Sequence, residues 1–528
     1  MRETESARPK PPPTRRDSGL PTGGEVESNL PGEGGSMFVK SFRVEGADFL
    51  KPEEIKNALA PYEEKDLTLA QIVEATDKLT VLCRQKGYMM AKAFLPRQNA
   101  RDGVLLILVA TGQYGALRLE NHSLVKDGVL EKIISRQLRS GQPIRRPELE
   151  RTVTLIGDLA GAQLPQIYTS KGATPESADF QFNVQPSRRF NGYLVTDNQG
   201  SYYTGRWRFM AGGDLNSPFG LGDKLSLYGL VTDTGGMRNV GADYYLPLGG
   251  DGLLFNFGYS RVDYELGEEY EDTGSKGWVN QFKAGFSYPL QRTTEKSLYL
   301  DLFFAHNSMV DEVEFADYYR KKRSTTGTLK IRREAWSQLA GRNFYSNIQA
   351  GLTLGHLKFP NHERALEDKS FADTGGSFGR LNLELVGNLA LTDNFTFLGT
   401  ANFQKALNRN LDSSEQLNLT NVGGVRVFRE TVSGDEGYAG VGELRYRLPS
   451  IASYTHYLGV FYYLAGWKHE NDYDLVNSEN FSGAGFSYNA QLGPGYLNMQ
   501  VTKSYGEYPY SIRRESRTQF FVRFILTI

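Results

Sequence analysis

The most informative pattern in the chain is an alternation of residue types between Tyr438 and Leu448. Tyrosine, glycine and leucine take every second position, and Val441, Glu443 and Arg445 are among the residues between them. A period of two with unlike sides predicts a β-strand that separates two unlike environments. A membrane barrel, with lipid outside and a polar lumen inside, would produce this pattern. An exposed hairpin of a soluble sheet is the alternative.

Similar alternation recurs from Pro186 to the end of the chain, where no helix is predicted. Examples are Phe190–Asn198, Tyr203–Gly212, Lys224–Thr232, Leu298–His306, Tyr345–Leu354, Asn382–Ala390, Gly459–Trp467 and Gln519–Ile528. About 340 residues, at roughly 20 for each strand and its connection, give about 16 strands, an even number as in single-chain barrels. A soluble sandwich would have to bury the outward aromatic residues of all these strands. The pattern therefore favours a 16-stranded antiparallel transmembrane β-barrel over residues 186–528.

A glycine-containing loop, residues 421–436, precedes the first strand described above. Arg426 lies in this loop between Val425 and Val427. If the following strand spans a membrane, the loop is free to fold into the lumen and to place Arg426 there.

The first third of the chain has a different organisation. Residues 1–36 are rich in proline, glycine, serine and charge, and are predicted to form a flexible tail. Residues 37–112 predict a β-α-α-β-β unit, and residues 113–185 repeat its order of elements. The expected helices are Pro52–Leu59, Leu69 to about Lys86, Val125–Leu138 and Pro147–Gly157, and the expected strands include Met89–Pro96, Val104–Val109, Ala116–Glu120, Gln163–Thr169 and Asp179–Val184. Each unit would offer a sheet edge that can accept an extended segment of another chain.

Composition narrows the classes of partner. The 60 Lys and Arg residues nearly balance the 61 Asp and Glu residues, so no nucleic acid is expected. The longest apolar run, Val104–Ala110, is far too short for a membrane-spanning helix. No apolar signal core is visible at the start of the chain. An exported protein with this sequence would be a processed form or have a misplaced start.

No catalytic, metal or cofactor pattern stands out. Gly375–Gly379 fits G-x-S-x-G around Ser377, but that motif needs a helix after the serine, and a glycine-rich turn is predicted instead. The six histidines have no metal-ligand spacing, and no phosphate-binding Gly-x-x-x-x-Gly-Lys occurs. The lone cysteine, Cys83, lies on the apolar face of a predicted helix and is expected to be a buried small hydrophobe.

From Met37 to Ile528 the chain resembles the outer-membrane transporters of two-partner secretion, of the ShlB/FhaC/HecB type, within the Omp85 superfamily. The residues that carry the resemblance are Gly87-Tyr88, Ala93–Gln98 and Asp102–Val104 for a first POTRA domain, Pro147–Arg151 and Leu155–Gly161 for a second, and Asp197–Gly200, Tyr203–Gly205 and Gly220–Asp223 for the first barrel hairpin. The resemblance implies two periplasmic POTRA domains, residues 37–112 and 113–185, before a barrel in the bacterial outer membrane. The plug helix of the family is not evident in residues 1–36.

The resemblance also implies a site in the loop. The motif residues are Gly423, Gly424, Val425, Arg426, Val427 and Phe428. They match the family's Val-Arg-Gly-Phe/Tyr motif, whose arginine lies in the lumen, except that Val427 replaces its glycine. In Tyr462–Gly466, where the family usually has Phe-x-Asp-x-Gly, Leu464 stands at the position of the acid that would pair with the arginine. A lumen arginine needs an anion or water, and Glu443, on the polar face of its strand, is the candidate partner.

The function implied by the resemblance is a passive pore. An unfolded secreted exoprotein (TpsA-like) would bind the POTRA domains and cross the lumen, and its folding outside, rather than nucleotide hydrolysis, would drive the movement. The expected partners are this exoprotein and outer-membrane lipid, with no cofactor. The alternatives are an Omp85-type insertase that assembles other outer-membrane proteins, and a barrel enzyme that uses Ser377.

Overall fold

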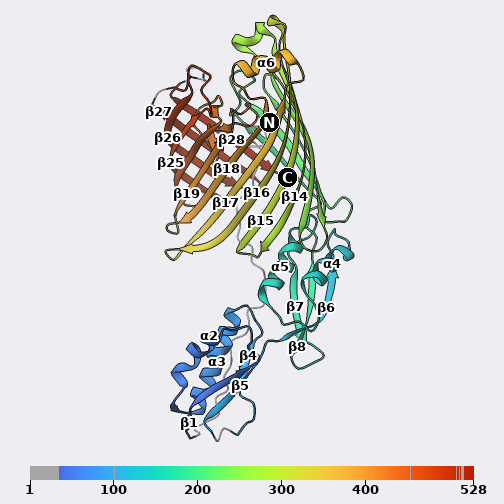
Figure 1. Cartoon of the computed structure of the whole chain (residues 1–528), viewed down its shortest axis with the longest axis vertical. Helices are drawn as coiled ribbons and strands as arrows, with labels where there is room; N and C mark the ends of the chain where they lie inside the picture. Colours follow the sequence, from blue (N-terminus) through green and yellow to red (C-terminus); the bar gives the residue numbers. More distant parts are fainter. Residues whose placement is uncertain (1–34, 100–101, 452–453, 507, 511, 513–515) are drawn as a thin grey trace.

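Two small α+β units and one large barrel follow each other along the chain (Figure 1). The computed structural model describes residues 35–99, 102–451, 454–506, 508–510, 512 and 516–528. The predicted tail and any plug helix fall, apart from residues 35 and 36, outside these residues.

The first unit has the predicted β-α-α-β-β order with one small addition. Its elements are β1 (Met37–Val39), β2 (Ser41–Glu45), α2 (Pro52–Leu59), η1 (Ala60–Tyr62), β3 (Lys65–Leu67), α3 (Leu69–Gln85), β4 (Lys92–Phe94) and β5 (Val104–Ala110). The sheet order is β2-β5-β4, with β2 parallel and β4 antiparallel to β5, while β1 pairs with β3 in a separate ladder. Cys83 is buried in the core beneath α3, as predicted.

The second unit repeats this topology. Its elements are β6 (Gln113–Asn121), α4 (Asp127–Gln137), α5 (Arg146–Gly157), β7 (Gln166–Lys171) and β8 (Ser177–Val184). The sheet order is β6-β8-β7, with β6 parallel and β7 antiparallel to the central strand. Most residues of β7 are exposed, so this strand is an accessible edge of the sheet.

The second unit also contacts the barrel through its helices. The guanidinium of Arg292 donates two hydrogen bonds of 2.7 Å to the carboxylate of Asp158, at the end of α5. The guanidinium of Arg151 donates to the carbonyls of Asp251 and Pro289, in and beside barrel turns. These contacts fix one end of the barrel against the second unit.

The long strands after the second unit form one closed barrel, which confirms the predicted fold. Within the described residues the barrel has 16 antiparallel strands and closes between β28 and β9. The strands are β9 (Phe190–Asp197), β10 (Arg208–Asn216), β11 (Lys224–Thr232), β12 (Met237–Leu248), β13 (Leu253–Glu265), β14 (Ser275–Arg292), β15 (Lys296–Val313), β16 (Tyr318–Leu339), β17 (Arg342–Lys358), β18 (Gly376–Ala390), β19 (Phe395–Ala406), β24 (Glu436–Arg447), β25 (Thr455–Lys468), β26 (Ser478–Leu492), β27 (Gly495–Tyr505) and β28 (Thr518–Thr527). The barrel therefore excludes the soluble hairpin.

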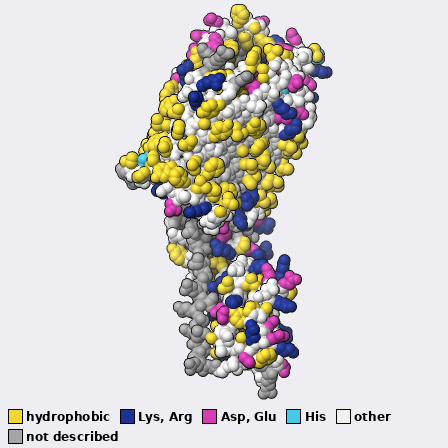
Figure 2. Space-filling view, turned by 90° about the vertical axis from the view of Figure 1, so that its left-hand side faces the viewer, with side chains coloured by type: hydrophobic (Ala, Val, Ile, Leu, Met, Phe, Trp, Pro, Cys, Tyr) yellow, Lys and Arg dark blue, Asp and Glu magenta, His cyan; other side chains and the backbone are white. Residues whose placement is uncertain are grey.

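The two sides of the wall differ as the alternation predicts. Outward residues such as Phe304, Leu329 and Leu354 are exposed, whereas inward Asp197 and Arg208 are buried and form an ion pair of 2.7 Å. Figure 2 shows hydrophobic side chains spread over the barrel wall and many charged side chains on the small units. No helix in the described part of the chain is long and apolar enough to cross a membrane.

The structure differs from the predicted elements in three places. A helix, α6 (His362–Ser370), lies between β17 and β18, where no helix was predicted. Residues 203–207 form turns, and the strand predicted from Tyr203 begins at Arg208. The predicted glycine-rich turn around Ser377 is wrong, because β18 begins at Gly376.

Candidate functional site

A long loop between β19 and β24, residues 407–435, folds against the inner wall of the barrel; we call it the lumen loop. Two short ladders shape it, β20 (Leu417–Asn418) with β23 (Ser433–Gly434) and β21 (Asn421–Val422) with β22 (Val425–Arg426). Gly423 and Gly424 make the tight turn of the second ladder, both with positive φ (60° and 82°). Two consecutive left-handed residues suit a two-residue hairpin turn, and glycine adopts them without steric cost.

Apolar packing attaches this loop to strands β24–β26. The buried cluster consists of Leu417, Leu419, Val422, Val425, Val427, Phe428 and Val432 from the loop, Ala439, Val441, Phe461, Tyr463, Ala465, Trp467 and Phe481 from the barrel strands, and Ile512 from the connection between β27 and β28. A barrel lumen would otherwise be polar and wet. The loop is therefore packed as a core is packed, and leaving the wall would expose this apolar surface to water.

Arg426 lies at the centre of the contacts between loop and wall, and it is 1% exposed. Its Nε donates a hydrogen bond of 2.8 Å to the carbonyl of Phe428, and its guanidinium also donates to the carbonyl of Arg429. The Arg426 backbone N–H donates to the side-chain oxygen of Gln500 (3.3 Å), and its carbonyl accepts from the hydroxyl of Thr502 (2.9 Å). The side chain thus shapes the loop while the backbone binds β27.

Val427, which replaces the family's glycine, fits because the wall has a glycine opposite it. A Cβ atom added to Gly483 of β26 would lie 3.0 Å from Cγ1 of Val427. The next side chain, Phe428, packs edge-to-face on Phe481 with 5.2 Å between ring centroids. Because Gly483 has no side chain, the wall leaves room for the side chain of Val427 in the loop.

Residues Arg429 and Glu430 of the loop contact the segment that follows β9, next to the place where β9 and β28 close the barrel. The guanidinium of Arg429 donates a hydrogen bond to the carbonyl of Asn198, just after β9. The carboxylate of Glu430 accepts from the Ser201 hydroxyl (2.7 Å) and from the Tyr202 backbone N–H (2.6 Å). The lumen loop thus contacts both β24–β27 and the segment that follows β9.

The predicted pair of Arg426 with Glu443 is not formed. Glu443 is buried on the inner wall, as its parity predicted, but its carboxylate accepts a 2.8 Å hydrogen bond from Arg445 and another from Ser487. Two neighbours on the wall therefore satisfy Glu443, and carbonyl oxygens of the loop itself accept from Arg426.

The assignment of Leu464 to the position of the lumen acid is also wrong. Leu464 is 43% exposed on the outer face of β25, beside the exposed Tyr462. The residue of this segment that faces the loop is Tyr463, which is fully buried and whose hydroxyl donates to the carbonyl of Leu419. The predicted lumen position and the side chain that faces the lumen are therefore one residue apart, a shift that moves a side chain to the other side of the wall.

A polar chamber of about 1030 Å³ lies at the end of the barrel nearest the small units. Its lining includes Arg188, Tyr193, Asp214, Arg445 and Tyr496, all inward-facing or at the rim. The chamber is lined by positive and negative side chains and by neutral groups that form hydrogen bonds. Such a lining suits a polypeptide segment better than a single small ligand.

The alternative chemistry has little geometric support. Ser377 contacts His356, with 3.1 Å between its hydroxyl oxygen and Nδ1, but both lie on strands of the outer wall and no helix follows the serine. Among the described residues, no group of three or more histidine, cysteine, aspartate or glutamate side chains could bind a metal ion.

Three site residues were missed by sequence reasoning: Gln500, Thr502 and Tyr463. The alternation of Gly495–Tyr505 marks Gln500 and Thr502 as inward residues, but an inward polar residue is ordinary in a barrel. Nothing in the sequence indicates which of the many inward polar side chains meet the loop.

Comparisons with known proteins identify the family of the chain and the fold of the barrel. The model of the family described as "Haemolysin secretion/activation protein ShlB/FhaC/HecB" matches residues 176–489, and that of the "POTRA domain, ShlB-type" matches residues 37–112. The "Heme/hemopexin transporter protein HuxB" of Haemophilus influenzae is 26% identical over 483 residues, which cover 90% of this chain and 84% of that protein. The "Outer membrane transporter CdiB" of Escherichia coli is 24% identical over 480 residues, 87% of this chain and 77% of its own length.

Solved structures show the same fold. CdiB from Escherichia coli superposes with a TM-score of 0.76 at 22% identity, over 96% of this chain and 92% of the other. CdiB from Acinetobacter baumannii gives a TM-score of 0.68 at 14% identity, over 100% and 96%. BamA from Haemophilus ducreyi lacking POTRA domains 1–3 gives 0.51 at 13% identity, over 93% and 100%.

Proposed function

The chain belongs to the haemolysin secretion/activation protein family ShlB/FhaC/HecB, a family of outer-membrane two-partner secretion transporters, and from this premise we propose that it exports one exoprotein through its barrel. The exoprotein arrives unfolded in the periplasm, binds the two small units and passes through the lumen to the cell surface. The lumen loop is displaced to let it pass.

The sheet edges of the small units are the proposed first contact. In the second unit β7 exposes most of its residues, among them the aromatic ring of Tyr168. An extended segment added to this edge gains backbone hydrogen bonds whatever its side chains are. This suits an unfolded substrate, and the polar chamber near this end of the barrel is the next compartment on the proposed route.

The lumen loop carries the proposal. Its packing on β24–β26 and its contacts beside β9 make it the element that must move before a chain can cross. Arg426 keeps the loop compact through bonds to two loop carbonyls, so that it moves as one body. Folding of the exoprotein outside drives net movement, without nucleotide hydrolysis.

The test compares the proteins of the culture medium and of the outer membrane with and without the gene, and with Arg426→Ala. We expect one large exported protein to disappear from the medium without the gene, while other barrels stay unchanged. In Arg426→Ala we expect its export to fall severalfold while the variant still reaches the outer membrane.

Other outcomes would contradict the proposal. A general decrease of outer-membrane barrels would indicate an insertase, and an unchanged medium would leave a simple pore or an enzyme. Normal export by Arg426→Ala would contradict the role of the loop alone. HuxB is named as a haem/haemopexin transporter, so a partner that binds haem or haemopexin is one class to look for in the medium.

A further inference from the structure

On one part of the barrel, the outward residues change from apolar to polar at one level of four neighbouring strands. Phe304, Leu329 and Leu354 are about half exposed on β15, β16 and β17 (51%, 47% and 58%). Toward the end with α6, beyond these residues and the glycines level with them on β16 and β18, the outward residues are His306, Thr325, His356 and Ser377, which lie side by side in the strand register. In an outer-membrane barrel this change marks where acyl chains end and headgroups begin.

Two cations lie one step beyond this polar row. Arg323 of β16 and Lys358 of β17 are paired directly across the ladder, and both are exposed on the outer face. Like charges opposite each other on adjacent strands are destabilising. Among the described residues neither side chain has an ion pair. The outward acid on the neighbouring strand, Glu312, is opposite Tyr319, two outward positions further along β16.

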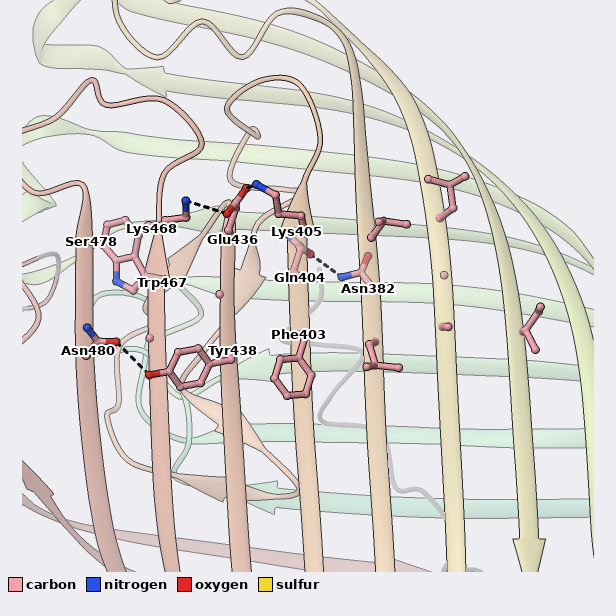
Figure 3. Close-up of a pocket in the computed structure, with 18 of the residues that line it drawn as sticks. Asn382, Phe403, Gln404, Lys405, Glu436, Tyr438, Trp467, Lys468, Ser478 and Asn480 are labelled. Atoms are coloured by element: carbon pink, nitrogen blue, oxygen red, sulfur yellow. Dashed lines mark hydrogen bonds and ion pairs between the residues drawn. The ribbon is translucent and has the colours of Figure 1, made fainter.

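A second pair of basic residues on the outer wall, Lys405 and Lys468, differs from Arg323 and Lys358 because carboxylates of the chain neutralise it. Lys405 and Lys468 both bind the carboxylate of Glu436, which lies between them (Figure 3). Lys405 also binds Glu470. These lysines have their anions within the chain.

An apolar groove of about 920 Å³ crosses the same strands six residues away from the two cations, where Leu329 and Leu352 form its nearest lining. Its apolar lining comes from Leu329, Ile331, Leu352, Leu381, Leu383, Phe403 and Tyr438. From Arg323 to Leu329 is six residues, about 20 Å along a strand, which is the length of a fatty acyl chain. Figure 3 shows the groove passing across the outer wall toward Tyr438 and Phe403.

We propose that this face binds a phosphorylated glycolipid of the outer leaflet, with a phosphate between Arg323 and Lys358 and an acyl chain that runs along the exposed Phe304, Leu354 and Leu329 to the near edge of the groove. The phosphate offsets the repulsion between the two cations, and His306 and His356 are placed to donate hydrogen bonds to headgroup oxygens. The acyl chain covers the exposed leucines of β16 and β17. A resident lipid at this place would brace the long strands that carry α6.

The test uses the full purified chain in detergent and measures binding of bisphosphorylated lipid A and of its dephosphorylated form by native mass spectrometry. We expect the unaltered chain to prefer the phosphorylated form, and Arg323→Gln with Lys358→Gln to bind it about 30-fold more weakly, since the two basic groups near a lipid headgroup contribute about 1 kcal/mol each. The control, Lys503→Gln with Arg517→Gln, removes the same charge from the exposed wall near the outer ends of β27 and β28 and should bind normally.

Three results would overturn the proposal: equal loss in both double variants, equal binding of dephosphorylated lipid, or displacement of the lipid by millimolar inorganic phosphate. If the Arg323→Gln, Lys358→Gln variant does not form a barrel, acetylation of the unaltered chain provides the test. Bound lipid A should slow acetylation of Lys358 but not of Lys503, and equal rates at the two lysines would contradict the proposal.

Discussion

At the scale of single residues, the attachment of the lumen loop depends on fit more than on ionic pairing. The expected partner of Arg426 binds other groups, and the wall instead provides Gln500, Thr502 and a glycine opposite Val427. Charge alone could not have identified this site from the sequence. Parity identified Glu443 as inward correctly, but it gave no information on which inward residues touch each other.

The first prediction concerns this fit. Gly483→Ala should loosen the loop, because the new methyl group would lie 3.0 Å from Cγ1 of Val427 and 3.1 Å from the carbonyl of Lys503. Overpacking of this kind costs about 1–3 kcal/mol. Pore conductance in planar bilayers should therefore rise. Val427→Gly combined with Gly483→Ala should restore part of the low conductance. The control, Gly387→Ala on the outer wall, should leave the conductance unchanged. Unchanged conductance in Gly483→Ala would contradict the close fit.

The second prediction concerns Cys83. Burial raises the pKa of its thiol to about 11, so the reactive thiolate is scarce in the folded chain at pH 8. Alkylation by iodoacetamide should be at least about tenfold slower in the native protein than in urea. The folded state should also lose stability as pH rises above about 9, because the unfolded chain then binds fewer protons. Equal alkylation rates would show that the first unit opens freely.

At the scale of elements, alternation predicted the strands well inside the apolar band and poorly beyond it. Lys224–Thr232 agrees with β11, whereas Leu298–His306 covers only the middle of β15, Lys296–Val313. Past His306 apolar and polar residues of β15 no longer alternate, with Met309 and Val310 adjacent, and the period of two disappears. The helix α6 was missed for a related reason, because none of its residues is buried and no apolar face marks it.

The third prediction concerns the seam of the barrel. The β9–β28 ladder is short, from Tyr193 to Asp197, and Asn198 extends it with side-chain bonds to the Phe520 carbonyl (3.0 Å) and the Val522 N–H (2.8 Å). Asn198→Ala removes both bonds, so the Val522 amide should exchange with deuterium roughly tenfold faster. Asn382→Ala removes a comparable bond inside the long β18–β19 ladder and should have little effect. Unchanged exchange at Val522 would mean that the ladder alone closes the seam.

At the scale of the whole molecule, substrate handover requires that the second unit keeps its place on the barrel. Arg292, 11% exposed, joins the two parts with a bidentate contact to Asp158. Hydrogen bonds to charged groups contribute about 1.5–3 kcal/mol, so Arg292→Ala should broaden the distance distribution between spin labels on the second unit and the barrel. Export should fall with it, although the lumen loop is intact. Arg43→Ala breaks an exposed pair within the first unit and should change neither the distances nor export. If Arg292→Ala also leaves the distances sharp, the remaining contacts, among them those of Arg151 and Arg136, suffice to fix the orientation.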